Sequence, residues 1–171
     1  MSDKLANEPE PVSFGQRLAS SQAFSALFRD GMALVEETAV YLDGPGRTES
    51  KLLERPAALA YATESMRLTT RLMQLASWLL LHRAVNEGEM SLAQASQEKS
   101  KVKLSSLDQG DPDVISRLPE SLRDLIERSG KLQEQVRRLD STIHSNGTEQ
   151  PQANAVEQQL GLLKAAFERQ E

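Results

Sequence analysis

The sequence predicts an all-α protein, an antiparallel three-helix bundle with one short extra helix. Hydrophobic residues make up 39% of the 171 residues but aromatic residues only 4%, so leucine, alanine, methionine and valine must build the core. Such a core suits helices better than a β-sandwich. Apolar residues also recur every three or four positions along several long stretches, which segments containing glycine and proline separate. Because amphipathic helices must cover their apolar stripes, we expect them to pack together.

Composition limits the possible functions. The net charge of −5 and the pI near 5.2 argue against nucleic acid as a general partner. The absence of cysteine excludes disulfides, a thiol nucleophile and thiolate metal sites. The N-terminus lacks the apolar core of a signal peptide, and the longest apolar run, LMQLASWLLL, is about half of the ~20 residues that span a bilayer. We therefore expect a cytoplasmic protein.

The first helix is predicted from about Ser20 to Leu42, with Ser21 as its N-cap. In the following DGPG sequence, Gly44 is expected to adopt a positive φ and Pro45 to stop the helix. The residues RTESKLLER, 47–55, are interpreted as a linker. The apolar face of this helix comprises Phe24, Leu27, Phe28, Val35, Ala39 and Leu42.

The second helix is predicted to begin at Pro56, whose missing N–H is harmless in a first turn, and to stop near Gly88. A helical wheel at about 100° per residue divides it into two halves. The apolar half is expected to form core with Tyr61, Ala62, Met66, Leu68, Leu72, Met73, Leu75, Ala76, Leu79 and Leu80. The polar half holds Thr63, Glu64, Arg67, Thr70, Arg71, Gln74, Ser77 and His82.

Two large apolar residues, Trp78 and Leu81, interrupt this polar half. Aromatic residues and arginine are enriched at protein interfaces, and small hydroxyl residues allow close helix approach. One interpretation is therefore a dimer or partner interface. The alternative is that Trp78 packs under the loop at 98–113 while Arg67 pairs with Glu64. The candidate interface residues are Arg67, Thr70, Arg71, Gln74, Ser77, Trp78 and Leu81.

The third part of the bundle follows a short helix around residues 91–99, where Ser91 and Gln94 form a capping-box pattern. A loop is expected over about 98–117, before a long helix over 119–143. Ser129 is the only member of its apolar seam without an apolar side chain. The other seam residues are Leu122, Leu125, Leu132, Val136, Leu139 and Ile143.

The chain is thus divided into a disordered N-terminus at 1–19, a helical bundle domain at 20–144, and a flexible tail at 145–171. The tail carries a short amphipathic segment that could bind a groove on another protein or fold back onto the bundle. Its apolar residues are Val156, Leu160, Leu163 and Phe167.

No catalytic, cofactor or metal site is predicted. The two histidines, His82 and His144, are far apart in sequence without ligand spacing, and no phosphate-binding loop is present. An alternative function is a phosphotransfer domain that uses His82 as its nucleophile, although Trp78 and Leu79 would crowd it. The neighbouring Glu36 and Glu37 point in different directions, so an acid–base pair is not expected.

A basic run of Lys99, Lys101 and Lys103 is interpreted as a solvated loop, with contact to an acidic partner as the alternative.

Two strings, FRDGMALVEETAVYLDGPGR at 28–47 and ATESMRLTTRLMQLASWLLLHRAVNEGEM at 62–90, resemble the family of RcdA, the regulator of CtrA degradation, formerly a domain of unknown function. The resemblance extends from about Phe24 to Ala95 and weakens after Glu98. It implies a non-enzymatic three-helix bundle that forms a homodimer.

The resemblance further implies an adaptor that promotes degradation of cell-cycle regulators such as CtrA by the ClpXP protease. The implied partners are the ClpX/ClpP complex, a response-regulator-like factor, a cyclic-di-GMP effector protein and the CtrA cargo. Recruitment of such a bacterial adaptor to a cell pole is also expected. The alternative is a structural interaction bundle with no role in proteolysis.

Overall fold

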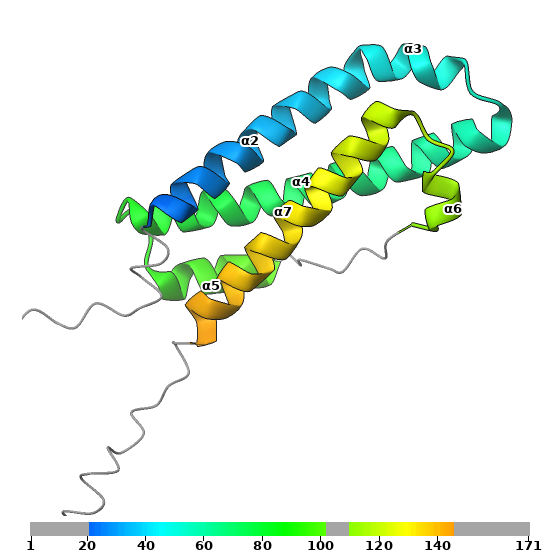
Figure 1. The fold of residues 1–171 in the computed structure, drawn as a ribbon. Coiled ribbons are helices and arrows are strands. Elements are labelled where there is room, and N and C mark those ends of the chain that lie inside the picture. The colour runs from blue at the N-terminus through cyan, green and yellow to red at the C-terminus, as the bar shows by residue number, and fades with distance from the viewer. Residues whose placement is uncertain (1–20, 102–109, 146–171) are drawn as a thin grey trace, which may run out of the picture.

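The computed structural model describes residues 21–101 and 110–145, and these residues form helices without any strand. Three long helices, α2 (Gln22–Asp43), α4 (Arg55–Asn86) and α7 (Glu120–Ser145), form the bundle (Figure 1). Three shorter ones, α3 (Pro45–Lys51), α5 (Leu92–Lys101) and α6 (Pro112–Ile115), lie between them. The predicted all-α bundle is confirmed. The expectations for 1–19 and for the tail segment fall outside the described residues.

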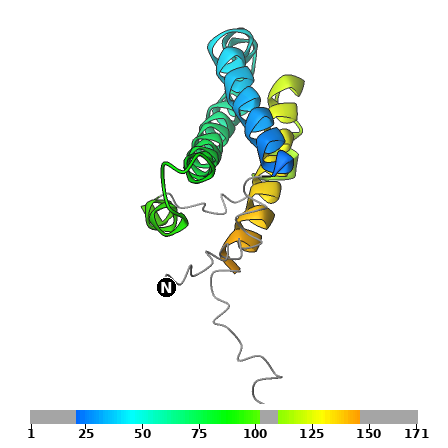
Figure 2. The same ribbon diagram turned by 90° about the vertical axis from the view of Figure 1, so that its left-hand side faces the viewer.

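Helix α2 runs antiparallel to both of its neighbours, whereas α4 and α7 run in the same direction (Figure 1). The side-chain pairs show this register. Arg71 donates a hydrogen bond to Ser129, and Trp78 donates one to Asp140. Because the later residue of α4 pairs with the later residue of α7, the two helices run parallel. Both α5 and α6 pack against α4, and Gly110, just before α6, lies against Glu64 in the first half of α4. After a 90° turn, α4 lies to the left of α2 and α7 to its right, with α5 beside the C-terminal end of α4 (Figure 2).

Both ends of α2 lie within two residues of the predicted positions, but the conformation of its C-cap differs from the prediction. The side chain of Ser21 accepts a hydrogen bond from the Phe24 amide at 3.4 Å, as a helix N-cap should. Gly44 caps the end with φ −121°, so the expected positive φ was wrong. The predicted linker was also partly wrong, because Pro45 occupies the first turn of a new helix, α3, rather than ending helical structure.

The glycine inside α3 allows this helix to pack closely against the end of α2 and the start of α4. A Cβ atom on Gly46 would lie 2.4 Å from the hydroxyl oxygen of Tyr61 and 2.8 Å from the backbone oxygen of Tyr41. Tyr41 donates a hydrogen bond of 2.6 Å to Glu49, which ties the end of α2 to α3. The close approach of these two tyrosines therefore depends on glycine at position 46.

The remaining helix boundaries follow the predicted signals closely. Helix α4 ends at Asn86, and Gly88 has the only positive φ among the described residues, 73°. Ser91 and Gln94 bond each other's backbone amides, which confirms the capping box. The expected loop contains more helix than predicted, because α5 continues to Lys101 and α6 forms at Pro112–Ile115.

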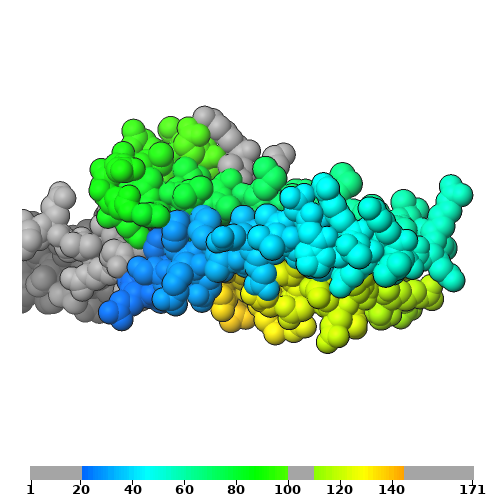
Figure 3. All heavy atoms as spheres, turned by 90° about the horizontal axis from the view of Figure 1, so that it is seen from above, coloured from blue at the N-terminus to red at the C-terminus, as the bar shows by residue number. Residues whose placement is uncertain are grey.

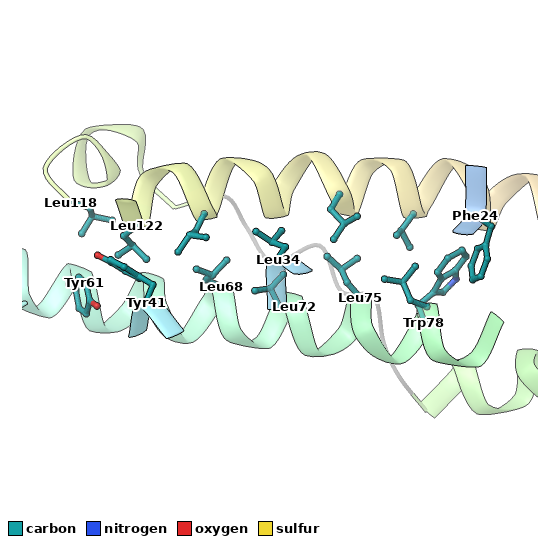
Figure 4. Close-up of a cluster of buried hydrophobic side chains, with 14 of the residues drawn as sticks. Phe24, Leu34, Tyr41, Tyr61, Leu68, Leu72, Leu75, Trp78, Leu118 and Leu122 are labelled. Atoms are coloured by element: carbon teal, nitrogen blue, oxygen red, sulfur yellow. The ribbon is translucent and has the colours of Figure 1, made fainter. Parts of the chain in front are cut away.

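The core runs between α4 and α7 and is closed by α2 (Figure 4). It is mainly aliphatic, with Phe24 beside Trp78 at one end and Tyr41 beside Tyr61 at the other. From above, α2 and α3 together run along the length of the body, and α5 protrudes beside α2 (Figure 3). The predicted seam of α7 is confirmed by the burial of Leu122, Leu125, Leu132, Val136 and Ile143, with Leu139 partly buried.

A pair of glycine substitutions tests this packing. Gly46→Ala should lower the free energy of unfolding by about 1–3 kcal/mol, because backbone at Tyr41 cannot yield to the new methyl group. Gly130→Ala should raise it by roughly 0.5–1 kcal/mol, since a Cβ there meets nothing within 4 Å and alanine favours the helix. Urea unfolding of both variants measures the difference. Equal effects of the two substitutions would contradict the packing described here.

Candidate functional site: the two faces of helix α4

Helix α4 presents one face to the bundle and another to solvent, and its inward aliphatic residues are those predicted. Leu68, Leu72, Leu75 and Leu79 are each no more than 3% exposed. They recur at the three- and four-residue steps of a helix that packs against two partners. This row anchors α4 and fixes how the rest of the helix is rotated.

Polar residues of α4 also point inward, toward α7. Arg71 is buried and donates a hydrogen bond of 2.8 Å to the hydroxyl of Ser129, which in turn donates to the Ile126 carbonyl. This explains why the apolar seam of α7 contains a serine. Burial lowers the pKa of Arg71 from its usual value. The predicted pair of Arg67 and Glu64 is confirmed, with a separation of 2.9 Å.

Trp78 belongs to the interior and not to a surface. Its side chain is 1% exposed, lies 6.2 Å from the Phe24 ring between centroids, and donates a hydrogen bond of 2.8 Å to Asp140 on α7. Its indole ring also packs on His82, with centroids 4.1 Å apart. The expectation that Trp78 offers free surface to a partner was therefore wrong, because α7 supplies the acceptor that its N–H requires.

The two histidines lie together beside this tryptophan. They are 62 positions apart in the sequence, the same separation as that between Trp78 and Asp140. The His82 and His144 ring centroids are 5.9 Å apart. Asp140 lies between them and accepts from Lys99 of α5, while its Oδ1 is 3.3 Å from Nε2 of His144. Burial lowers the pKa of His82 to about 4 and also depresses the pKa of His144, so both rings are neutral at pH 7.

The outward face of α4 carries a stripe of large apolar side chains spaced seven residues apart, here called the α4 stripe. It consists of Leu59, Met66, Met73 and Leu80, which are 70%, 72%, 67% and 53% exposed. The prediction that Met66, Met73 and Leu80 belong to the core was therefore wrong. The seven-residue spacing is visible in the sequence. Because Arg71, Trp78 and His82 face the interior, α4 is rotated so that this row faces solvent.

Small residues that flank the α4 stripe hide their hydroxyl groups within the helix. Thr63, Thr69 and Ser77 donate to the carbonyls of Leu59, Ser65 and Met73 at 3.0, 2.8 and 2.9 Å. Their polar atoms are thereby satisfied without water or a partner. The surface between the large side chains is consequently shallow and can approach another helix closely.

The seven residues predicted as an interface are divided by the structure. Arg71 and Trp78 are buried in the chain's own bundle, whereas Thr70 is exposed next to the α4 stripe. Arg67 retains 40% of its side-chain exposure beside Glu64. Gln74, Ser77 and Leu81 are partly buried. For the residues that remain at the surface, an interface stays a prediction.

These features define a class of protein: a helical bundle whose clearest surface feature among the described residues is an exposed apolar stripe. The model of the family described as "Protein of unknown function (DUF1465)" matches residues 15–167. The crystal structure of RcdA from Caulobacter crescentus CB15 is 51% identical, with a TM-score of 0.60, and the match covers 75% of this chain and 96% of that one. The chain belongs to the RcdA family.

No curated protein sequence matches the chain significantly. Among the described helices, none has both the length and the hydrophobicity that crossing a bilayer requires.

The buried His82 predicts a stability that depends on pH. Its pKa is near 4 in the folded chain and 6.5 in the unfolded one, so the unfolded chain binds the extra proton between these values. The stabilising contribution of neutral His82 is complete above about pH 6.5 and is lost as the pH falls toward 4, by about 3 kcal/mol in all.

Urea unfolding in the presence of a chelator at pH 7.5, 6 and 5 measures this loss. His82→Phe should flatten the decline between pH 6.5 and 5 relative to the wild type, since its ring does not titrate. Parallel declines for the two proteins would show that other groups cause the pH dependence.

Proposed function

We propose that this chain is a non-enzymatic adaptor that promotes degradation of cell-cycle regulators such as CtrA by the ClpXP protease. Two findings support the proposal: membership of the RcdA family and the α4 stripe, which offers a contact surface that the bundle does not itself use. An adaptor requires such surfaces because it acts by holding a protease complex and its cargo near each other. The observation that carries the proposal is the relationship to RcdA at 51% identity.

The α4 stripe is proposed to bind a second copy of this chain. From Leu59 to Leu80 it extends about 32 Å, at about 1.5 Å per residue. Large side chains alternate with small residues along this length, so an antiparallel copy can place large residues against small ones. Exposed apolar rows of this kind are typical of interfaces rather than of free surfaces.

The dimer would then present two identical sets of outer surfaces to the other proposed partners. These are the ClpX/ClpP complex, the response-regulator-like factor, the cyclic-di-GMP effector protein and the CtrA cargo. The tail segment Val156–Phe167 is proposed as a further contact, either with such a partner or with the bundle.

The alternative of a phosphotransfer domain is not favoured. The His82 ring is 2% exposed and packs against Trp78, so a phosphorylated receiver domain cannot reach its nitrogens without opening the bundle.

Contact of the basic run with an acidic partner is also less favoured, because Lys99 already pairs with Asp140. An interaction bundle without a role in proteolysis remains the second candidate, supported by the α4 stripe alone.

Substitution of the α4 stripe tests the proposed dimer. Met66→Lys with Met73→Lys should convert a dimer into a monomer, because two ammonium groups per chain would have to be desolvated in the interface. Light scattering measures the mass, and turnover of CtrA by reconstituted ClpXP should fall in parallel. The unfolding midpoint should change little, because both side chains are mostly exposed.

The matched control is Leu52→Lys with Val40→Lys, since these residues are 83% and 64% exposed but lie outside the α4 stripe. This control should remain dimeric. If the variant with Met66→Lys and Met73→Lys stays dimeric, the dimer interface lies outside the α4 stripe.

Truncation after Ser145 tests the tail separately from the dimer. The truncated chain should keep the dimer and the unfolding midpoint but lose at least fivefold in the stimulation of cargo turnover. Undiminished stimulation by the truncated chain would remove the tail from the proposed mechanism. If the truncated chain and the full-length chain both dimerise but neither stimulates turnover of any candidate cargo, the interaction bundle without a role in proteolysis is favoured.

A further inference from the structure

Three potential metal ligands meet where α4, α5 and α7 come together. One ring nitrogen of His82, one of His144 and one carboxylate oxygen of Asp140 all lie within 4.8 Å of one another. His82 is buried, while the other two residues are partly buried. Imidazole and carboxylate together are ligands that zinc and related divalent ions accept in proteins. Nothing in the aliphatic packing of the bundle requires this concentration of polar groups.

One ring nitrogen of His144 faces Asp140, and the other faces Ser96 of α5. The Ser96 hydroxyl donates to the Leu92 carbonyl at 3.0 Å, and its oxygen lies 3.4 Å from Nδ1 of His144. A neutral imidazole carries its proton on one nitrogen only, and the tautomer with that proton on Nδ1 presents the Nε2 lone pair as a possible ligand. That nitrogen lies 3.3 Å from Oδ1 of Asp140.

Nε2 of His144 lies close to this carboxylate oxygen but makes no hydrogen bond within the described part of the chain. The spacing suits a metal ion, because ligand atoms about 2.0–2.1 Å from a tetrahedral zinc ion lie about 3.3 Å apart. The Nδ1 of His82 is buried and has no hydrogen-bond partner within the described part of the chain. Several other buried side-chain atoms of the described residues also lack a partner, but this nitrogen and Nε2 of His144 lie in one cluster with a carboxylate, where a bound ion would satisfy both.

Neighbouring residues supply the outer support that metal ligands require. Trp78 holds Asp140 in place by donating to its Oδ1 at 2.8 Å, and Ser96 orients the His144 ring. Such outer contacts fix the direction of ligand lone pairs. The one opposing group is Lys99, whose ammonium group contacts Oδ2 of Asp140. Its side chain is 28% exposed, so it can turn toward solvent when a divalent ion takes its place.

We propose that His82, Asp140 and His144 form a binding site for a divalent transition-metal ion of the zinc type. The ion replaces the Lys99 ammonium group as the counter-charge of Asp140. Small rotations of the side chains bring the three ligand atoms to coordination distance, and water completes the coordination. Because the ligands come from α4 and α7 while Lys99 and Ser96 belong to α5, occupancy changes how α5 is held against the bundle.

The test is Zn²⁺ binding by the full-length, untagged protein, measured by titration calorimetry and by the rise in thermal midpoint. One ion per chain is expected, with at least a tenfold loss of affinity in His144→Gln. Lys99→Gln should act in the opposite direction and raise the affinity several-fold, because the competing ammonium group is gone. Co²⁺ in place of Zn²⁺ should give the visible absorption of a four-coordinate site, and His144→Gln should abolish it.

Asp113→Asn is the matched control, since this exposed carboxylate lies on α6 and should not affect binding. Circular dichroism establishes that each variant is folded. If His144→Gln does not fold, Lys99→Gln alone decides the outcome, because its side chain is partly exposed and removing it leaves all three ligands in place. Zinc uptake that is insensitive to His144→Gln, or weakened by Lys99→Gln, would overturn the proposal and indicate binding to surface carboxylates.

Discussion

The hydrogen bond from the Trp78 indole to Asp140 joins three helices at one point. Trp78 lies on α4, Asp140 on α7, and Asp140 also accepts from Lys99 of α5. An indole N–H buried without an acceptor would cost about 1–3 kcal/mol. This cost favours the alignment of α7 with α4 in which Asp140 lies beside Trp78. Further along the same interface, Arg71 imposes the same register through Ser129. Two buried polar contacts thus specify a parallel pairing that leucine packing alone would leave free to slide.

This register decides what α4 shows to solvent. Rotating Arg71, Trp78 and His82 inward turns the opposite row outward, and that row is Leu59, Met66, Met73 and Leu80. The exposure of the α4 stripe is therefore a consequence of the buried polar contacts. Covering each of these four side chains would contribute roughly 1–2 kcal/mol, because part of each is already buried, and this gain would offset part of the entropic cost of association.

Local signals in the sequence predicted most of the helices, because caps and turns act over only a few residues. Ser21, the capping box at Ser91 and Gln94, and Gly88 all have the predicted roles. The rotation of α4 could not be predicted in the same way. Its apolar residues cover more than half of the wheel, so hydrophobicity does not identify the inward face. Which face turns inward depends on Ser129 and Asp140, and because these residues lie on another helix, no pattern within α4 identifies them as partners.

The same reasoning applies to the histidines, which have no ligand spacing in sequence yet lie together in space. Parallel pairing of α4 and α7 places His82 one turn beyond Trp78, and His144 one turn beyond Asp140, so the bond between the tryptophan and the aspartate also brings the two rings into contact. An antiparallel arrangement of these two helices would have separated them. One register therefore creates a closed polar cluster at the end of the bundle and an open apolar surface along its side. A substitution that shifts this register should alter both together, whereas one confined to the outer face of α4 should leave the cluster intact.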